Sequence, residues 1–402
     1  WQYFDKKKLL EKAVEADEYR KSGKPLGSLH GLPIAVKDII GTFEMPTECG
    51  SPLRKKMPSS QDSEVVNLLK IEGAIVMGKT VTTELAYFHP GKTTNPHDNT
   101  RTPGGSSSGS AAVIAAHMAP LSIGTQTNGS VIRPASYCGV VGYKPSYGLI
   151  SRSGVMRQSD KLDHIGVFGK TVEDVALFAK SLIKKDLYDP STIHYAADEM
   201  LNVCKKGPIY EPKFIFYKTK NWKNIDKESQ KSFDFFIKTF SKNIEVFDTP
   251  SYFDDIPKYH KIIHETDMAN NFQGYYKKSK KFLSKEMVSA IERGLKYSAK
   301  EYAEAIDFMK RSYESYKEVF EDFHGVLTPS SSGVAPKGLK STGSPEFSTI
   351  WTYMGLPSIS LPLLIGANNL PLGIQLVGDK LDDLRFLGVA NWLEKNCKKY
   401  AK

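Results

Sequence analysis

Short apolar runs alternate with amphipathic stretches along the first half of the chain. Gly31–Ile40 (GLPIAVKDII) predicts a buried strand that contains a lysine. A helix over Ser63–Ile71 and a strand over Ala74–Met77 are expected next, and apolar runs recur in APLSIGTQT and CGVVGYKPS. TVEDVALFAKSLI predicts a helix with Thr171 at its N-cap and Asp174 three residues on. This alternation favours an α/β fold with a large mixed central sheet and helices on both faces.

The second half changes character and then returns to the earlier pattern. From 223 to 323 the chain is polar, rich in Lys, Tyr and Phe, and helical in period. Strand-like runs come back in VLTPSSSG, LPSISLPLL and PLGIQLVG, and a last helix follows. We therefore expect a single α/β/α domain over 1–402, with a helical insert at 223–323 that shapes a pocket. Residues 1–23 predict one amphipathic helix.

Composition is that of a globular protein, with 402 residues, 40% of them hydrophobic and 25% charged. No apolar run is long enough to span a membrane. Residue 1 is Trp rather than an initiator Met, so we expect some N-terminal sequence to be missing. The four cysteines are scattered and form no CxxC pair, which predicts free thiols in a reducing compartment, the cytoplasm.

Lysine supplies most of the net charge of +10. The densest patches are Lys277–Lys281 (KKSKK) and the stretch Lys205–Lys242. A basic face can bind RNA or a membrane surface. Carboxylates are interleaved through most of the chain, however, and no nucleic-acid motif accompanies the patches. We favour a solvated surface and expect neither a nucleic-acid nor a membrane partner.

Two glycine-rich loops carry candidate chemistry. In PGGSSSGSAAVIAAH, from Pro103 to His117, a flexible linker is the ordinary explanation of the glycines and serines. The run Ala111–Ala116 instead predicts a buried helix, so the loop would present free backbone N–H groups at a helix start. The second loop, in GTQTNGSVIRPAS, contains Ser130.

A serine hydroxyl becomes a good nucleophile only when a base takes its proton. None of the nine histidines lies in either loop. A lysine can serve if it is neutral, and burial lowers a lysine pKa by up to about 3–5 units. Lys37 lies on a largely apolar strand, which predicts such burial, and a second serine could relay the proton from Ser130. Taken alone, Lys37 also fits an exposed strand-end lysine and Ser130 an ordinary helix cap.

Together these motifs resemble those of the amidase signature family, which carries a run close to GGSSGGSA, then GTDTGGSIRIPA, and a Lys-Asp pair upstream. Here they are Gly104–Ala111, Gly124–Ser130 and Lys37-Asp38, with 24 residues from Ser106 to Ser130. The resemblance covers about 1–185 and 326–395; no motif matches the segment between.

The resemblance implies amide hydrolysis through a Ser–Ser–Lys triad and an acyl-enzyme intermediate. Ser130 would be the nucleophile, Ser106 the bridging serine after a cis peptide bond, and Lys37 the base. The backbone N–H groups of the implied oxyanion hole belong to Thr127, Asn128, Gly129 and Ser130. No cofactor and no metal are expected.

The chain departs from the family pattern near both loops. Ser108 and Asn128 replace glycines, and Gln126 replaces an aspartate. Ile132 stands where the family has an arginine, and Arg133 follows one place later. One negative and one positive position are lost together, which is consistent with a missing ion pair. None of these is a triad position, so the departures bear on the subfamily rather than the chemistry.

Other motifs are weaker. GSSSG fits a nucleophile elbow with Ser107 as nucleophile, but that motif needs a preceding strand, which NPHDNTRTPGG cannot form. HKIIHE spaces His260 and His264 as a metal pair, yet no third ligand follows, and a packed or surface pair is favoured. No P-loop or dinucleotide fingerprint is present.

Two functions remain within the family. One is a stand-alone amidohydrolase that releases an acid and ammonia or an amine. The other is the glutaminase (A-type) subunit of a tRNA-dependent glutamine amidotransferase, which passes ammonia to a partner. The changed loop residues and the unmatched insert favour the hydrolase, and the intact triad argues against a non-catalytic binding protein. We expect a small-molecule amide as substrate, neutral and apolar or aryl because AYFHPG and the insert are aromatic-rich; a homodimer stays open.

Overall fold

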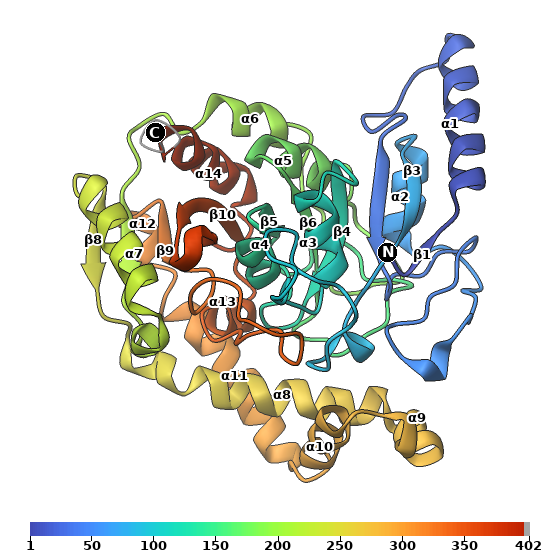
Figure 1. Ribbon diagram of the computed structural model, residues 1–402. Helices are drawn as coiled ribbons and strands as arrows, with labels where there is room; N and C mark the ends of the chain where they lie inside the picture. The colour runs from blue at the N-terminus through green and yellow to red at the C-terminus, as the bar shows by residue number, and fades with distance from the viewer. Residues whose placement is uncertain (398–402) are drawn as a thin grey trace.

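An eleven-stranded sheet forms the centre of the molecule in this computed structural model, which describes residues 1–397 (Figure 1). The strands are β1 Tyr3–Phe4, β2 Pro33–Lys37, β3 Ile75–Thr80, β4 Leu121–Gln126, β5 Val141–Lys144, β6 His164–Gly169, β7 Phe214–Tyr217, β8 Ile244–Phe247, β9 Gly325–Pro329, β10 Ser358–Ile365 and β11 Pro371–Val377. Their order is β1-β3-β2-β4-β6-β5-β10-β11-β9-β7-β8. Pairing is parallel around β2 and β7 and antiparallel from β4 through to β9, so the predicted mixed sheet is confirmed.

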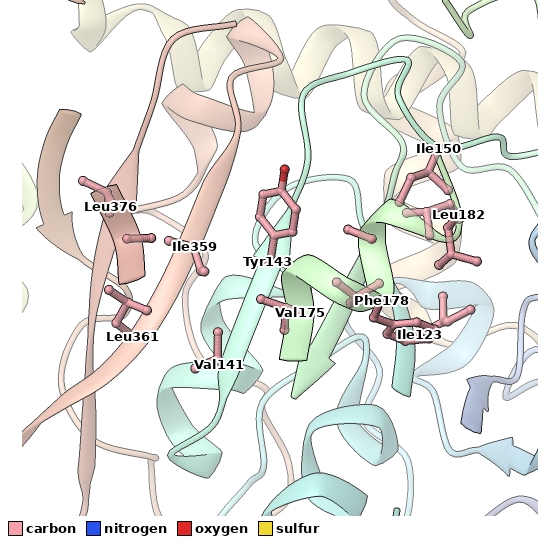
Figure 2. Packing of buried hydrophobic residues seen from close by; sticks show 14 of the residues in the cluster. Ile123, Val141, Tyr143, Ile150, Val175, Phe178, Leu182, Ile359, Leu361 and Leu376 are labelled. Carbon is pink, nitrogen blue, oxygen red and sulfur yellow. The ribbon is translucent and has the colours of Figure 1, made fainter. Parts of the chain in front are cut away.

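Helices cover both faces of the sheet, and the contacts of β5 show that α4 and α5 lie on opposite faces. The helices are α1 Lys6–Lys21, α2 Glu64–Ile71, α3 Ser108–Ala115, α4 Ile132–Cys138, α5 Val172–Lys180, α6 Met200–Lys206, α7 Lys227–Thr239, α8 Ile256–Asn271, α9 Gln273–Ser279, α10 Lys285–Gly294, α11 Ala299–Glu314, α12 Val319–Asp322, α13 Thr349–Met354 and α14 Asp383–Cys397. Successive residues of a strand point to opposite faces. Val141 and Tyr143 pack with Val175 of α5 (Figure 2). A Cβ on Gly142 would instead lie 2.6 Å from Cβ of Ala135 in α4, so α4 covers the other face.

Helix α3 lies unusually close to the sheet because its residues are small. Its sequence is SGSAAVIA, and all but the last of these residues are buried. A Cβ on Gly109 would lie 2.5 Å from the backbone nitrogen of Val81, just after β3. This close approach brings the serine-rich start of α3 to the ends of β2 and β4. The sequence predicted a buried helix here, and the structure confirms it.

The N-terminal segment differs from the expected single helix. Tyr3 and Phe4 form β1, which pairs with β3 at the edge of the sheet, and α1 follows. Helix α1 buries none of its residues, and Leu10 and Val14 are 57% and 60% exposed. The expected helix is therefore present, but it begins later and packs less than its pattern suggested.

The segment 223–323 contains α7 to α12 and also one strand, β8, which extends the sheet beside β7 (Figure 1). Only the first residue of β8, Ile244, is buried, so this short strand carried little signal in the sequence. Helices α10 and α11 both pack on α8, below the sheet in Figure 1.

All four cysteines are buried and unpaired, as expected. Among residues 1–397, no helix has both the length and the apolar character that crossing a membrane requires.

Candidate active site

Lys37 is the last residue of β2, and its side chain is fully buried. The strand lies between β3 and β4 in the sheet, and Ile34, Ala35 and Val36 before the lysine are also fully buried. The burial predicted from the apolar strand is therefore confirmed. An exposed strand-end lysine does not describe this residue.

Three hydroxyl groups surround the Lys37 amine. Nζ lies 2.7 Å from Ser106 Oγ, 3.0 Å from Ser107 Oγ and 2.7 Å from Thr125 Oγ1. Ser107 Oγ donates its single proton to the Thr125 carbonyl, so Lys37 must be the donor toward Ser107. A neutral amine has two N–H groups and one lone pair. When the two N–H groups point at Ser107 and Thr125, the lone pair is left to accept the hydroxyl proton of Ser106, and proton transfer from Ser106 requires this arrangement.

The surroundings of Lys37 favour this neutral form. Burial lowers the pKa of Lys37 well below its usual range, and the charge of Asp163 opposes that shift more weakly. The three groups within hydrogen-bond distance of Nζ are hydroxyls rather than carboxylates, so they do not hold a proton on the amine. Burial therefore favours the neutral amine, which is the form that can accept a proton.

Ser106 lies between Lys37 and the open side of the site. The Gly105–Ser106 peptide bond is cis. The Ser106 carbonyl accepts the N–H of Thr83 at 3.3 Å, and the Gly105 carbonyl accepts Nη2 of Arg133 at 2.6 Å. The Ser106 side chain contacts Lys37 and also lines a small cavity.

Ser130 ends the loop after β4 and lines the same cavity as Ser106. Its side chain is half-buried. No hydrogen bond joins the two serine hydroxyls in the part of the chain that the structure describes, so the serines share a cavity without direct bonding. Within those residues, the N–H groups of Asn128, Gly129 and Ser130 have no protein acceptor. They are available to stabilise an oxyanion.

Neutral hydrogen bonds replace the ion pair that the sequence suggested was missing. Gln126 Oε1 accepts the N–H groups of Val131 and Ile132, at 2.8 and 3.0 Å, where α4 begins. Asn128 Oδ1 accepts the hydroxyl of Thr349 at 2.7 Å. Asn128 does not adopt the positive φ that favours glycine, so the loop forms with asparagine at this position.

Two buried histidines of α8 reach the site from the segment 223–323. Nε2 of His260 lies 2.9 Å from the carbonyl of Thr127, and Nε2 of His264 lies 3.0 Å from Oε1 of Gln158. Burial lowers the pKa of His260 to about 4, so its imidazole is neutral and donates its Nε2 proton to the carbonyl. Residues 1–397 contain no group of three or more His, Cys, Asp or Glu side chains that could hold a metal ion.

The cavity at Ser130 is small, about 280 Å³ with its open mouth included. It is lined by Ala86, Tyr87, Phe88, Ser106, Thr127, Asn128, Gly129, Ser130, Arg133, Gln158, His264 and Pro345. A larger open cavity lies between α1, α2 and β3, but none of the predicted site residues lines it. We place the candidate active site at the smaller cavity because the convergent polar groups are there.

Sequence reasoning missed several contacts of the site. Ser107 was considered only as an alternative nucleophile, yet it is fully buried and holds Lys37. Thr125 and His260 were not assigned any role at the site. A hydroxyl run such as SSS or TQT indicates polar chemistry, but only the fold shows which hydroxyl meets the lysine.

Comparison with known proteins agrees with the geometry. A family model described as Amidase matches residues 1–387. The A-type subunit of glutamyl-tRNA(Gln) amidotransferase from Alkaliphilus metalliredigens is 32% identical over 96% of this chain and 87% of its own length. The protein of the same name from Fusobacterium nucleatum is 33% identical, with 97% and 88% covered.

A solved structure also shares the fold. It is described as a vestigial protein complex that reveals the evolutionary origins of an s-triazine catabolic enzyme. Its TM-score is 0.90 at 25% sequence identity, and the match covers 98% of this chain and 90% of that one.

Proposed function

The chain belongs to the amidase family, and from this premise we propose that it cleaves the C–N bond of a carboxylic amide with Ser130 as nucleophile, Ser106 as proton relay and Lys37 as base. The observation that carries the proposal is the buried Lys37 amine, 2.7 Å from a serine that lines the same cavity as Ser130. No cofactor or metal takes part in this scheme.

The first half-reaction forms an acyl-enzyme. Neutral Lys37 accepts the proton of Ser106, and Ser106 accepts the proton of Ser130. The Ser130 oxygen then bonds to the amide carbon, and negative charge develops on the carbonyl oxygen. In this proposal the N–H groups of Thr127, Asn128, Gly129 and Ser130 stabilise that charge. When the C–N bond breaks, the proton returns from Lys37 through Ser106 to the departing nitrogen, and ammonia or an amine leaves.

The second half-reaction repeats the proton path with water. Lys37 and Ser106 take one proton from water, and its oxygen bonds to the acyl carbon. The bond to Ser130 Oγ breaks, and Ser130 regains a proton through Ser106. A carboxylic acid is released and the enzyme returns to its starting state.

Covalent labelling tests the assignment of the nucleophile. An arylsulfonyl fluoride should modify Ser130 alone, as mapped by peptide mass spectrometry. Ser130→Ala should abolish labelling and lower kcat by several orders of magnitude while leaving the fold intact, because one small side chain is lost. Labelling at Ser107 would support the nucleophile-elbow alternative instead.

For the physiological substrate we favour glutamine, with this chain as the glutaminase (A-type) subunit of a tRNA-dependent amidotransferase. The named relatives support this role, since they align over 96% of the chain and so include most of the segment 223–323. The changed loop residues had favoured a stand-alone hydrolase, but Gln126 and Asn128 are held by ordinary neutral hydrogen bonds. The role adds partner subunits and tRNA to the expected small molecule, and it suits a cytoplasmic location.

A stand-alone amidohydrolase is the second candidate, and the likeness to a solved structure described as an amidase supports it. Ammonia release by the purified chain separates the two. A glutaminase subunit should turn over glutamine slowly alone and faster with its partner subunits and glutamyl-tRNA(Gln). A hydrolase should cleave small amides at full rate alone, and added partners should change nothing.

A further inference from the structure

Helix α8 turns a row of polar side chains toward the candidate active site. The row consists of His260, His264, Asp267 and Asn271. Successive members are three or four residues apart, so they lie along one side of the helix. Each contacts either the nucleophile loop, Thr127–Ser130, or the segment 158–159. Of the four, His264 is the one that also lines the cavity at Ser130.

The contacts of His264 fix which ring nitrogen carries its proton. Gln158 Nε2 donates to the Leu85 carbonyl at 2.6 Å, so Gln158 Oε1 is the acceptor that lies 3.0 Å from His264 Nε2. His264 must therefore donate from Nε2. Burial, with His260 as a smaller cause, lowers the pKa of His264 well below its usual range. The ring is neutral, and its Nδ1 keeps a lone pair.

His264 Nδ1 is an unoccupied acceptor at this cavity. Two other side-chain acceptors there are occupied, because Asn128 Oδ1 accepts the Thr349 hydroxyl and Gln158 Oε1 accepts His264. Within residues 1–397, no group donates to His264 Nδ1, and this atom is not among the buried polar atoms without a partner, so it is accessible. A carboxamide fits such a cavity, since its oxygen takes the free N–H groups of the nucleophile loop and its own N–H needs an acceptor.

We propose that His264 Nδ1 accepts a hydrogen bond from the nitrogen of the amide that Ser130 attacks. The proposal rests on the proposed function, because it needs the amide in this cavity. No proton moves to His264. The hydrogen bond holds the nitrogen in one orientation while Ser106 returns a proton to it and the C–N bond breaks. An ester has no N–H to offer, and its oxygen lone pairs would face that of Nδ1, so the site selects amides over esters.

Paired amides and esters of one acid test this selectivity. Glutamine and the γ-methyl ester of glutamate share an acyl group, and propionamide and methyl propionate form an uncharged pair. His264→Leu should lower kcat/KM for each amide by about 10- to 100-fold, the effect of a lost hydrogen bond in a closed site, and leave each ester within a few-fold. His264→Gln should recover part of the loss, because its amide oxygen can also accept.

Two further variants separate recognition of the amide from support of the fold. Gln158→Leu keeps the imidazole ring but removes the group that fixes its proton on Nε2, so the amide-to-ester ratio of kcat/KM should fall. Asn271→Ala is the control, since Asn271 lies in the same row, donates to the Gln158 carbonyl and does not line the cavity. It should keep the wild-type ratio.

The outcomes distinguish this inference from the proposed function. Equal losses for amide and ester in His264→Leu would overturn the inference, because a purely structural role lowers both rates, while amide cleavage by the wild type would still support the proposed function. Nitrogen NMR of the Ser130→Ala chain with isotope-labelled histidine needs no turnover. The His264 signals, assigned by their loss in His264→Gln, should show an unprotonated Nδ1 that shifts with propionamide and not with methyl propionate. A proton on Nδ1, or no shift with the amide, contradicts the inference even if Ser130 proves inert.

Discussion

Two buried lysines lie on adjacent strands, and the fold holds them in different ways. Lys37 ends β2, and Lys79 lies on β3 in register with Val36. Because successive side chains of a strand alternate, the two lysines point to opposite faces of the sheet. Both side chains are fully buried.

The acceptors around the two amines differ. Lys79 Nζ donates to the Ile40 carbonyl at 2.6 Å and to two threonine hydroxyls, and it lies 3.7 Å from Asp38. A carbonyl only accepts, and Asp38 favours positive charge. Burial lowers the pKa of Lys79 to about 8, whereas Lys37, with three hydroxyls as neighbours, is shifted well below its usual range. Burial alone does not make a base, because a neighbouring carboxylate and a backbone carbonyl favour the protonated amine at Lys79.

The largest expected effect separates the two lysines directly. Lys37→Met and Lys37→Arg should each lower kcat by about 10³-fold or more, because neither residue can accept the proton. Lys79→Met should leave kcat of the folded enzyme within a few-fold but lower the free energy of unfolding by about 3–5 kcal/mol, because Asp38 stays buried without its partner. Ammonia release and urea unfolding measure the two effects. An Lys37→Arg enzyme that kept most of its turnover would leave Lys37 only a positional role.

The next largest effect is the difference in kcat between substitutions of the two serines beside Lys37. Ser106→Ala should lower kcat by about 10²-fold, within the usual range for a lost proton-transfer group. Ser107→Ala is the matched control, because Ser107 accepts a hydrogen bond from Lys37 and passes no proton to it. This substitution should lower kcat by about tenfold, the effect of losing a single hydrogen bond. Steady-state kinetics on one amide gives both values. Equal losses would contradict the assignment of the lone pair to Ser106.

The pH dependence sharpens the comparison further. Activity requires neutral Lys37, so it should be present above the Lys37 pKa and lost as the pH falls through it. Lys79 titrates near 8 but should not affect catalysis, so the profile should show no step there and should be unchanged in Lys79→Met. An acid limb near pH 6 can also come from Asp163, whose pKa burial raises to about 6 and which accepts the Thr127 hydroxyl. Asp163→Asn should remove that contribution.

The smallest expected effect concerns the hydrogen bond between His260 and the nucleophile loop. His260→Leu removes one hydrogen bond to the Thr127 carbonyl and should lower kcat about three- to tenfold with little change in KM. His260→Gln keeps a donor and should recover most of the loss. A glutamine variant no better than leucine would show that His260 acts through packing alone.

The sequence predicted the sheet, most of its strands and the burial of Lys37, because apolar runs of strand length give a direct signal. It did not predict β8, of which only Ile244 is buried, or the weak packing of α1. It brought Lys37, Ser106 and Ser130 together only through a family resemblance, since residues so far apart in the chain meet only through the fold. The contact of His260 with Thr127 depends on a distance between separate elements, which spacing along the chain cannot give.

Neutron diffraction from deuterated crystals near neutral pH tests the central claim most directly, because it locates the protons that ordinary diffraction does not show. The account predicts two deuterons on Lys37 Nζ, directed at Ser107 and Thr125, and the hydroxyl deuteron of Ser106 pointing at Nζ. It also predicts that Lys79 Nζ carries a deuteron directed at the Ile40 carbonyl oxygen. A third deuteron on Lys37 Nζ pointing at Ser106 would contradict the neutral-base role.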